Sequence, residues 1–216
     1  KGMEEAVSLL REKRDEGASV RIIGDYDIDG VNATHILLTG LRRIGARVDT
    51  VIPDRMKDGY GVNENLIREA YEAGVDTIVT CDNGIAASAE IGFAKELGMT
   101  VVVTDHHEIP FREEEGERIF VLPPADVIVN PKQADCGYPF KMLCGAAVAW
   151  RLVEALYRAE GISREEALDL AEFAAVATVG DIMELRGENR ILVRYGLKRL
   201  EQTKNLGYRA LIGANG

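Results

Sequence analysis

The sequence predicts an α/β fold, in which a doubly wound, mainly parallel five-stranded sheet carries helices on both faces and is followed by a helical C-terminal part. Three observations support this prediction. Short apolar segments alternate with helix-length segments up to about residue 140, β-branched runs such as "TVVVT" (100–104) suit strands buried on both faces, and every later segment has a helical pattern. We therefore expect one domain over residues 1–216, with a sheet portion at 1–140 and a helical portion at 141–216.

The sheet portion begins with a charged amphipathic helix at residues 1–17. The five strand candidates are the apolar runs at 19–24, 47–53, 76–81, 100–104 and 125–130. Helical patterns lie between them at 31–45, 62–73 and 86–98, and parallel strands need such crossover connections. The segment 107–124, "HEIPFREEEGERIFVLPP", has neither pattern and is expected to be a charged surface loop.

The helical portion contains helix candidates at 142–161, 163–181, 189–203 and 207–216. In the second of these, Ser163 stands three residues before Glu166, which is the spacing of a capping box. No low-complexity linker and no internal repeat interrupts the chain. These helices are therefore expected to pack on or beside the sheet.

Composition narrows the classes of function. The net charge of −10 argues against a uniformly basic nucleic-acid-binding surface, although bound divalent cations would reverse the local sign and keep an anionic substrate open. No uninterrupted apolar run reaches the roughly 18 residues of a membrane span. Cys81, Cys136 and Cys144 lack a metal-binding spacing and are expected to be reduced thiols.

Acidic and imidazole side chains follow three of the predicted strands. They are Asp25, Asp27 and Asp29 after the first strand, Asp82 after the third, Asp105, His106 and His107 after the fourth, and Asp181 in the helical segment "TVGDIMEL". The carboxyl ends of parallel strands share one edge of a sheet, and open α/β sheets bind their ligands there. We therefore expect these side chains to converge.

Each residue taken alone also has a plain structural explanation. Asp82 belongs to an Asp-Asn-Gly turn sequence, adjacent histidines on a loop are usually solvated, and Asp181 could cap a helix. His35 has no acidic neighbour in sequence and is expected to pack or to face solvent. The set as a whole is harder to explain in this way, because uncompensated carboxylates at one edge would be strongly destabilising.

A pair of divalent cations would relieve that repulsion. Carboxylates with imidazole suit Mn²⁺, and Mg²⁺ where carboxylate and water dominate, while more than four such ligands favour two ions over one. Two ions about 3.5–4 Å apart can clamp a phosphate and activate water. The alternative of a metal-free mononucleotide-binding domain lacks a G-x-G-x-x-G or P-loop sequence at the first strand–helix turn.

In this order, "GDYDIDG", "CDNG", "DHH" and "VGDIMEL" resemble the four motifs of the DHH phosphoesterases. Within that superfamily, the segments 53–63, 128–150 and 181–197 look like those of RecJ-type single-strand-specific exonucleases, so the resemblance covers nearly the whole chain. It implies a metal-dependent phosphodiester hydrolase that cuts single-stranded DNA from the 5′ end and releases 5′-mononucleotides in DNA repair and recombination. It also implies a bacterial cytoplasmic location away from membranes, with a single-strand-binding protein or a helicase as candidate partners.

The resemblance also assigns roles to residues. Asp82 would bridge two Mn²⁺ or Mg²⁺ ions; Asp29, His106 and Asp181 would complete one site, and Asp27 with Asp25 the other. In class II pyrophosphatase relatives a histidine stands where this chain has Ile23, so the second site would depend on Asp25. Asp105 would orient His106, and His107 would hydrogen-bond the scissile phosphate or the leaving group.

Substrate contacts are expected from four cations, which could also be solvated surface charges: Arg55, Lys57, Lys141 and Arg190. Tyr60 and Tyr138 could stack on bases, although single aromatics near glycines usually pack. RecJ-type enzymes also carry a DHHA1 domain and usually an OB-fold, which lie beyond "LIGANG". This chain alone is therefore expected to bind metal and to degrade DNA poorly.

Two other functions stay open at this point. One is a DHH hydrolase of small substrates such as short oligonucleotides, pAp, cyclic dinucleotides or pyrophosphate, although those relatives typically have a histidine in the first motif. The other is a non-catalytic DHH scaffold, against which the intact set of acids and histidines argues.

Overall fold

A five-stranded parallel sheet forms the centre of the molecule in the computed structural model, which describes residues 1–56, 59 and 61–215. Its strands are β1 (Ser19–Ile23), β2 (Arg47–Val51), β3 (Thr77–Cys81), β4 (Thr100–Thr104) and β7 (Val127–Val129), in the order β2-β1-β3-β4-β7. All four pairings are parallel. The order reverses direction between β1 and β3, and this switch point is where doubly wound sheets bind ligands.

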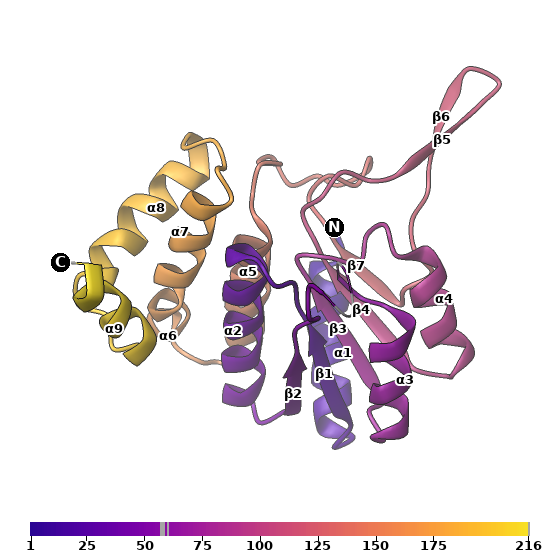
Figure 1. Ribbon diagram of the computed structural model, residues 1–216, viewed down its shortest axis with the longest axis horizontal. Coiled ribbons are helices and arrows are strands. Elements are labelled where there is room, and N and C mark those ends of the chain that lie inside the picture. The colour runs from indigo at the N-terminus through magenta and orange to yellow at the C-terminus, as the bar shows by residue number, and fades with distance from the viewer. Residues whose placement is uncertain (57–58, 60, 216) are drawn as a thin grey trace.

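Helices cover both faces of this sheet (Figure 1). In the described chain they are α1 (Met3–Asp15), α2 (Ile28–Arg43), α3 (Glu64–Glu72), α4 (Ser88–Glu96), α5 (Gly145–Ala159), α6 (Arg164–Asp169), α7 (Ala171–Gly180), α8 (Gly187–Leu200) and α9 (Leu206–Asn215). Helices α1, α2 and α5 cover one face, α3 and α4 cover the other, and α6 to α9 form a further helical layer against α2 and α5. The predicted fold class is therefore confirmed.

The alternation of side chains along the strands supplies a core on each side. Ile22, Val79 and Val102 lie in register and point into the core beneath α1, α2 and α5. Ile78 and Val101 lie in register and join the opposite core, beneath α3 and α4. All five residues of β3 are buried, as expected for a central strand covered on both faces.

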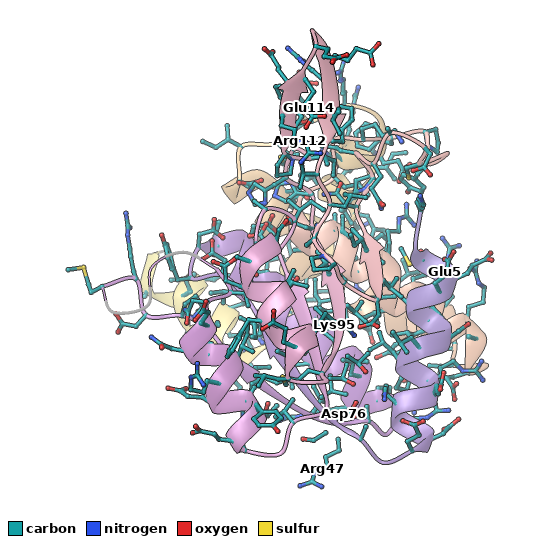
Figure 2. All side chains as sticks on the ribbon, turned by 90° about the vertical axis from the view of Figure 1, so that its right-hand side faces the viewer. Glu5, Arg47, Asp76, Lys95, Arg112 and Glu114 are labelled. Carbon is teal, nitrogen blue, oxygen red and sulfur yellow. The ribbon has the colours of Figure 1, made fainter. Side chains whose placement is uncertain are left out.

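The segment 107–124 corrects the prediction of a loop, because it contains the hairpin β5 (Phe111–Glu114) and β6 (Glu117–Phe120). Glu115 and Gly116, with φ of 52° and 85°, form a turn in which both central residues are left-handed. Glutamate is an unusual residue there, so the turn has little signal in the sequence. The hairpin projects from the body, and its strands are exposed; Figure 2 labels Arg112 and Glu114, which form an ion pair at 2.8 Å.

Three helix predictions also change. Helix α2 begins at Ile28 and not at residue 31, so Asp29 lies inside its first turn. The helix expected at 163–181 is divided at Leu170 into α6 and α7. Ser163 is the N-cap of α6 without a side-chain cap bond, and Glu166 is instead paired with Arg43 at 2.7 Å, so the capping box is not formed.

The other structural expectations agree with the observed fold. Cys81, Cys136 and Cys144 are free and buried. His35 packs against Phe173 with ring centroids 4.3 Å apart. Among the described helices, none combines the length and the hydropathy that a membrane crossing would need.

Candidate metal centre

The predicted acids and histidines gather at the carboxyl edge of the sheet, around the switch point between β1 and β3. Within the described residues, three groups of side chains place their ligand atoms within 4.8 Å of one another: Asp29, His106 and Asp181; Asp25, Asp27 and Asp82; and Asp82, His106 and His107. Asp82 belongs to two of these groups and therefore links the two sides of the centre. This arrangement matches the convergence that the sequence predicted.

Asp82 sits directly after β3 in a left-handed conformation, with φ of 61°. Its backbone N–H donates to the Thr104 carbonyl at 3.1 Å, which continues the ladder to β4. The neighbouring Asn83 side chain donates to the carbonyls of Ile23 and Cys81 at 3.2 and 2.9 Å, and so joins the ends of β1 and β3. The Asp-Asn-Gly turn is thus compatible with the predicted ligand role, because the turn aims the Asp82 carboxylate into the centre.

His106 contacts carboxylates from three different elements. Its Nε2 lies 3.0 Å from Asp82 Oδ1, 3.5 Å from Asp29 Oδ2 and 3.9 Å from Asp181 Oδ2. Asp181 is the C-cap of α7, so the capping explanation applies to it, and its carboxylate also lies beside His106. Burial lowers the pKa of His106, which favours the neutral imidazole that a metal ion requires.

Asp29 is fixed by the start of helix α5. Its two carboxylate oxygens accept hydrogen bonds from the backbone N–H groups of Gly145 and Ala146, at 2.6 and 2.7 Å. Gly145 also lies against Asp82, since a Cβ added to it would be 2.6 Å from Asp82 Oδ1. Sequence reasoning missed Gly145 and Ala146, because a contact across 116 residues leaves only the small-residue run after Cys144 as a signal.

Asp25 and Asp27 form the other side of the centre. Asp25 is fully buried; its Oδ1 accepts from the Tyr26 N–H at 2.8 Å, while Oδ2 has no hydrogen-bond partner among the described residues. Asp27 is exposed and acts as the N-cap of α2, accepting from the Gly30 N–H at 2.9 Å. Burial raises the pKa of Asp25, with a further contribution from Asp27.

Asp105 corrects one prediction. Its Oδ1 lies 2.7 Å from His107 Nδ1, so it orients the ring of His107 and not that of His106. His106 meets Asp105 only through its backbone N–H, which donates to Asp105 Oδ1 at 2.7 Å. The ring Nδ1 of His106 has no hydrogen-bond partner in the described chain. The reason is geometric, because Asp105 Oδ1 also accepts from the His107 backbone N–H at 3.1 Å, so the chain turns around this carboxylate and brings the His107 ring to it. The hydrogen bond to Asp105 raises the pKa of His107.

The electrostatics of the centre call for positive charge. Burial, and then the nearby Asp29, raise the pKa of Asp82 to about 11, and burial likewise raises the pKa of Asp181. Together with the unpartnered buried Oδ2 of Asp25, these shifts describe a site with an excess of carboxylate oxygens. Carboxylates with one neutral imidazole are the donors that Mn²⁺ and Mg²⁺ use, so the residues present fit two such ions.

The predicted substrate cations are less closely gathered. Arg55 is exposed, with its guanidinium 5.4 Å from the centroid of the Tyr26 ring, and Arg190 is exposed on α8. Lys141 Nζ donates to the Cys136 carbonyl at 2.6 Å, which ties it to its own loop. Lys57 and Tyr60 lie outside the described residues. Tyr138 donates to Glu188 at 2.6 Å, in keeping with a packing role.

Comparisons with known proteins identify the family of this chain. Residues 19–178 match the DHH family, N-terminal domain. The single-stranded-DNA-specific exonuclease RecJ of Bacillus subtilis is 44% identical to this chain over 216 residues, which are 100% of this chain and 26% of the relative.

Two solved structures are similar over the whole chain. A crystal structure of exonuclease RecJ bound to manganese has a TM-score of 0.87 and 38% identity, and the match covers 100% of this chain and 52% of that one. RecJ from Thermus thermophilus in complex with Mn²⁺ has a TM-score of 0.81 and 35% identity, with 100% and 30% covered. The chain thus spans from about a quarter to about half of the length of these relatives.

Proposed function

This chain belongs to the DHH family, and from that membership we propose that it is the hydrolytic core of a RecJ-like, metal-dependent exonuclease. The proposed reaction is the removal of 5′-mononucleotides from the 5′ end of single-stranded DNA, in DNA repair and recombination in the cytoplasm. The observation that carries the proposal is the convergence of two carboxylate groups on Asp82 at the switch point of the sheet. A single-strand-binding protein or a helicase would be its protein partners.

Two divalent cations, Mn²⁺ or Mg²⁺, would be held by the residues of this centre. Asp29, His106 and Asp181 would hold one, Asp25 and Asp27 the other, and Asp82 would contact both. When bound, such ions supply Lewis acidity toward the phosphate and lower the pKa of water.

The chain's own residues would orient the substrate around these ions. Asp105 engages Nδ1 of His107 and raises its pKa, which favours the imidazolium, and the Nε2–H of that form would donate to a phosphate oxygen or to the leaving oxygen. Arg55, Lys57 and Arg190 would contact flanking phosphates, as the sequence suggested. Lys141 is a weaker candidate because its ammonium already donates to a backbone carbonyl.

The test is mononucleotide release from 5′-phosphorylated single-stranded DNA, first with Mn²⁺ and then with Mg²⁺. Wild type would be compared with Asp82→Ala and with Asp76→Asn. Asp76 stands at the opposite end of β3 from Asp82, where it is paired with Lys13 at 3.1 Å, so its change controls for loss of a carboxylate on the same strand (Figure 2).

We expect slow release by wild type and Asp76→Asn, loss of release in Asp82→Ala, and no release from a blunt duplex. A dinucleotide degraded in preference to the long strand would instead support the small-substrate hydrolase. Calorimetric Mn²⁺ binding without any hydrolysis would contradict the exonuclease activity of this chain, and absence of both would support a scaffold.

A further inference from the structure

Ile182 is the most anomalous residue at the rim of the metal centre. It follows Asp181 directly, its side chain is 90% exposed, and its backbone is left-handed with φ of 56°. A β-branched residue rarely adopts this conformation, and a large apolar side chain gains nothing from full exposure to water. Both features are unfavourable for the isolated fold.

The hydrogen bonds around Ile182 show which residue type the backbone prefers there. The N–H of Met183 donates to the Thr178 carbonyl and that of Ile182 to the Val179 carbonyl, each at 3.1 Å. This is the Schellman ending of a helix, in which the left-handed position is usually glycine. The chain therefore has isoleucine where glycine would be more stable, and residues that break a local rule in this way concentrate at functional sites.

Ile182 is part of a wider apolar surface, which we call the shoulder: Ile28, Val31, Val179 and Ile182, exposed by 44, 45, 46 and 90%. Its two halves, from the first turn of α2 and the end of α7, meet at Gly180. A Cβ on Gly180 would lie 2.6 Å from Ile28 Cγ2, so the two pieces of chain touch. The shoulder alternates in sequence with Asp27, Asp29 and Asp181, and it therefore borders the metal centre directly.

The occupant of the shoulder has to combine an apolar surface with an anion. The four side chains of the shoulder offer the apolar contact. Divalent cations held by the neighbouring carboxylates would make the local charge positive, and the occupant would therefore carry an anionic group on that side. The segment after Asp181 leads into α8, whose first turn exposes Arg190, and this cation has no ion-pair partner within the described residues. A nucleotide joins a flat apolar base to a phosphate at a short, fixed distance, and so matches both demands.

We propose that Ile182, supported by the shoulder, packs against a base that flanks the scissile phosphate of a single-stranded DNA substrate. Apolar side chains such as isoleucine are used in this way as wedges between bases, and a paired base inside a duplex is not available to such a contact. The proposal rests on the proposed exonuclease function and adds to it a residue that favours unpaired nucleotides.

The test compares three 5′-phosphorylated single strands in Mn²⁺: one with all bases, one abasic at the first nucleotide and one abasic at the second. For wild type, one of the two abasic strands should show kcat/KM lower by about tenfold, the scale of one base–side-chain contact. Ile182→Gly should abolish that penalty, while Ile182→Leu keeps it. Calorimetric Mn²⁺ binding should be the same in all three proteins.

Stability separates this role from a structural one. Ile182→Gly should raise the Tm by about 2–4 °C, because glycine adopts the left-handed conformation without strain. The control is Ile191→Ala on α8, which removes a side chain that is 71% exposed, and it should leave the abasic penalty unchanged. A lower Tm in Ile182→Gly, as would result if another part of the protein packed on this residue, would overturn the proposal.

The outcomes also distinguish the two proposals. If an abasic strand lowers kcat/KM equally in wild type and Ile182→Gly, or in neither, Ile182 does not contact a base. That result overturns the proposal for Ile182 and leaves the exonuclease function standing. No hydrolysis of any strand by wild type overturns the exonuclease function, and the wedge with it.

Discussion

The two sides of the metal centre meet at Asp82 but differ in how firmly their carboxylates are held. On the His106 side, both oxygens of Asp29 accept backbone hydrogen bonds from the start of α5, at 2.6 and 2.7 Å. On the other side, Asp25 is equally buried and its Oδ2 has no partner in the described chain, while Asp27 is exposed.

This difference concerns preorganisation. A ligand that is already oriented loses little conformational freedom when an ion arrives, and a neutral imidazole is a ready donor. A buried carboxylate with an unsatisfied oxygen is a strained arrangement until a cation reaches it. We therefore expect the His106 side to bind its ion more tightly, and the Asp25 side to be filled only at higher metal concentration.

Replacing one aspartate on each side tests this comparison most strongly. Asp29→Asn should lower the affinity for the tighter Mn²⁺ ion by at least about a hundredfold, since changes even to groups outside the direct ligands cost roughly 10- to 100-fold. Asp25→Asn should leave that ion in place and weaken only the second one. Calorimetric Mn²⁺ titration, fitted to two sites, measures both affinities.

The metal-free proteins test the same pair in a second way. Asp25→Asn should raise the Tm in chelator, because it removes a buried carboxylate with an unpartnered oxygen. Asp29→Asn should lower it, because the amide nitrogen cannot accept the hydrogen bond that one backbone N–H donates. Equal losses of metal and equal shifts of Tm in the two variants would contradict the comparison.

Gly145→Ala should affect both sides at once with a somewhat smaller effect. The added Cβ would lie 2.6 Å from Asp82 Oδ1, so either Asp82 or the start of α5 has to move, and the latter would also shift the N–H groups that hold Asp29. We expect both Mn²⁺ affinities to fall by about 10- to 100-fold.

The matched control for Gly145→Ala is Gly92→Ala, in helix α4. A Cβ on Gly92 would find only Pro124 Cγ, at 3.9 Å, and alanine favours a helix over glycine. This variant should bind Mn²⁺ as wild type does and have an equal or higher Tm. If Gly145→Ala also binds as wild type does, the role of α5 in positioning Asp29 and Asp82 is wrong.

Sequence reasoning predicted that these acids and histidines converge because the placement of most of them follows from strand topology. Asp82 and His106 each come after a strongly apolar strand, and parallel strands bring their carboxyl ends together whatever the rest of the fold does. The two core-forming faces follow from the same regularity. These features depend on local pattern, which a single sequence contains.

Other features depend on contacts that no local pattern encodes. The hydrogen bond from the Gly145 N–H to Asp29 joins α5 to α2. Asp105 contacts the ring of His107 and not that of His106 because of the direction of these side chains after the strand. The exposure of Ile182 is likewise a property of its surroundings, although an isoleucine after Asp181 is plain in the sequence. The hairpin at 111–120 had a local signal, the Glu115–Gly116 turn, but its atypical glutamate made that signal weak.

The pH dependence of the metal-free protein tests whether Asp82 is the focus of the excess charge. An unfolded aspartate has a pKa of about 3.9, whereas the pKa of Asp82 in the fold is raised to about 11. Between these values the folded state holds a proton that the unfolded state has lost. Stability should therefore fall as pH rises, by at most about 1.4 kcal/mol per pH unit for this group.

Thermal unfolding in chelator from about pH 5.5 to 8.5 measures this slope. Asp82→Asn should make it shallower, and Asp76→Asn should not, because Asp76 lies at the opposite end of β3 beside Lys13. The raised pKa values of Asp25 and Asp181 act in the same direction and should leave a residual slope. Saturating Mn²⁺ should reverse the trend, since an ion binds the carboxylate form and binds better as protons leave. A Tm that rises with pH in chelator would show that the carboxylates are already balanced within the fold, and would remove the electrostatic reason for a second ion.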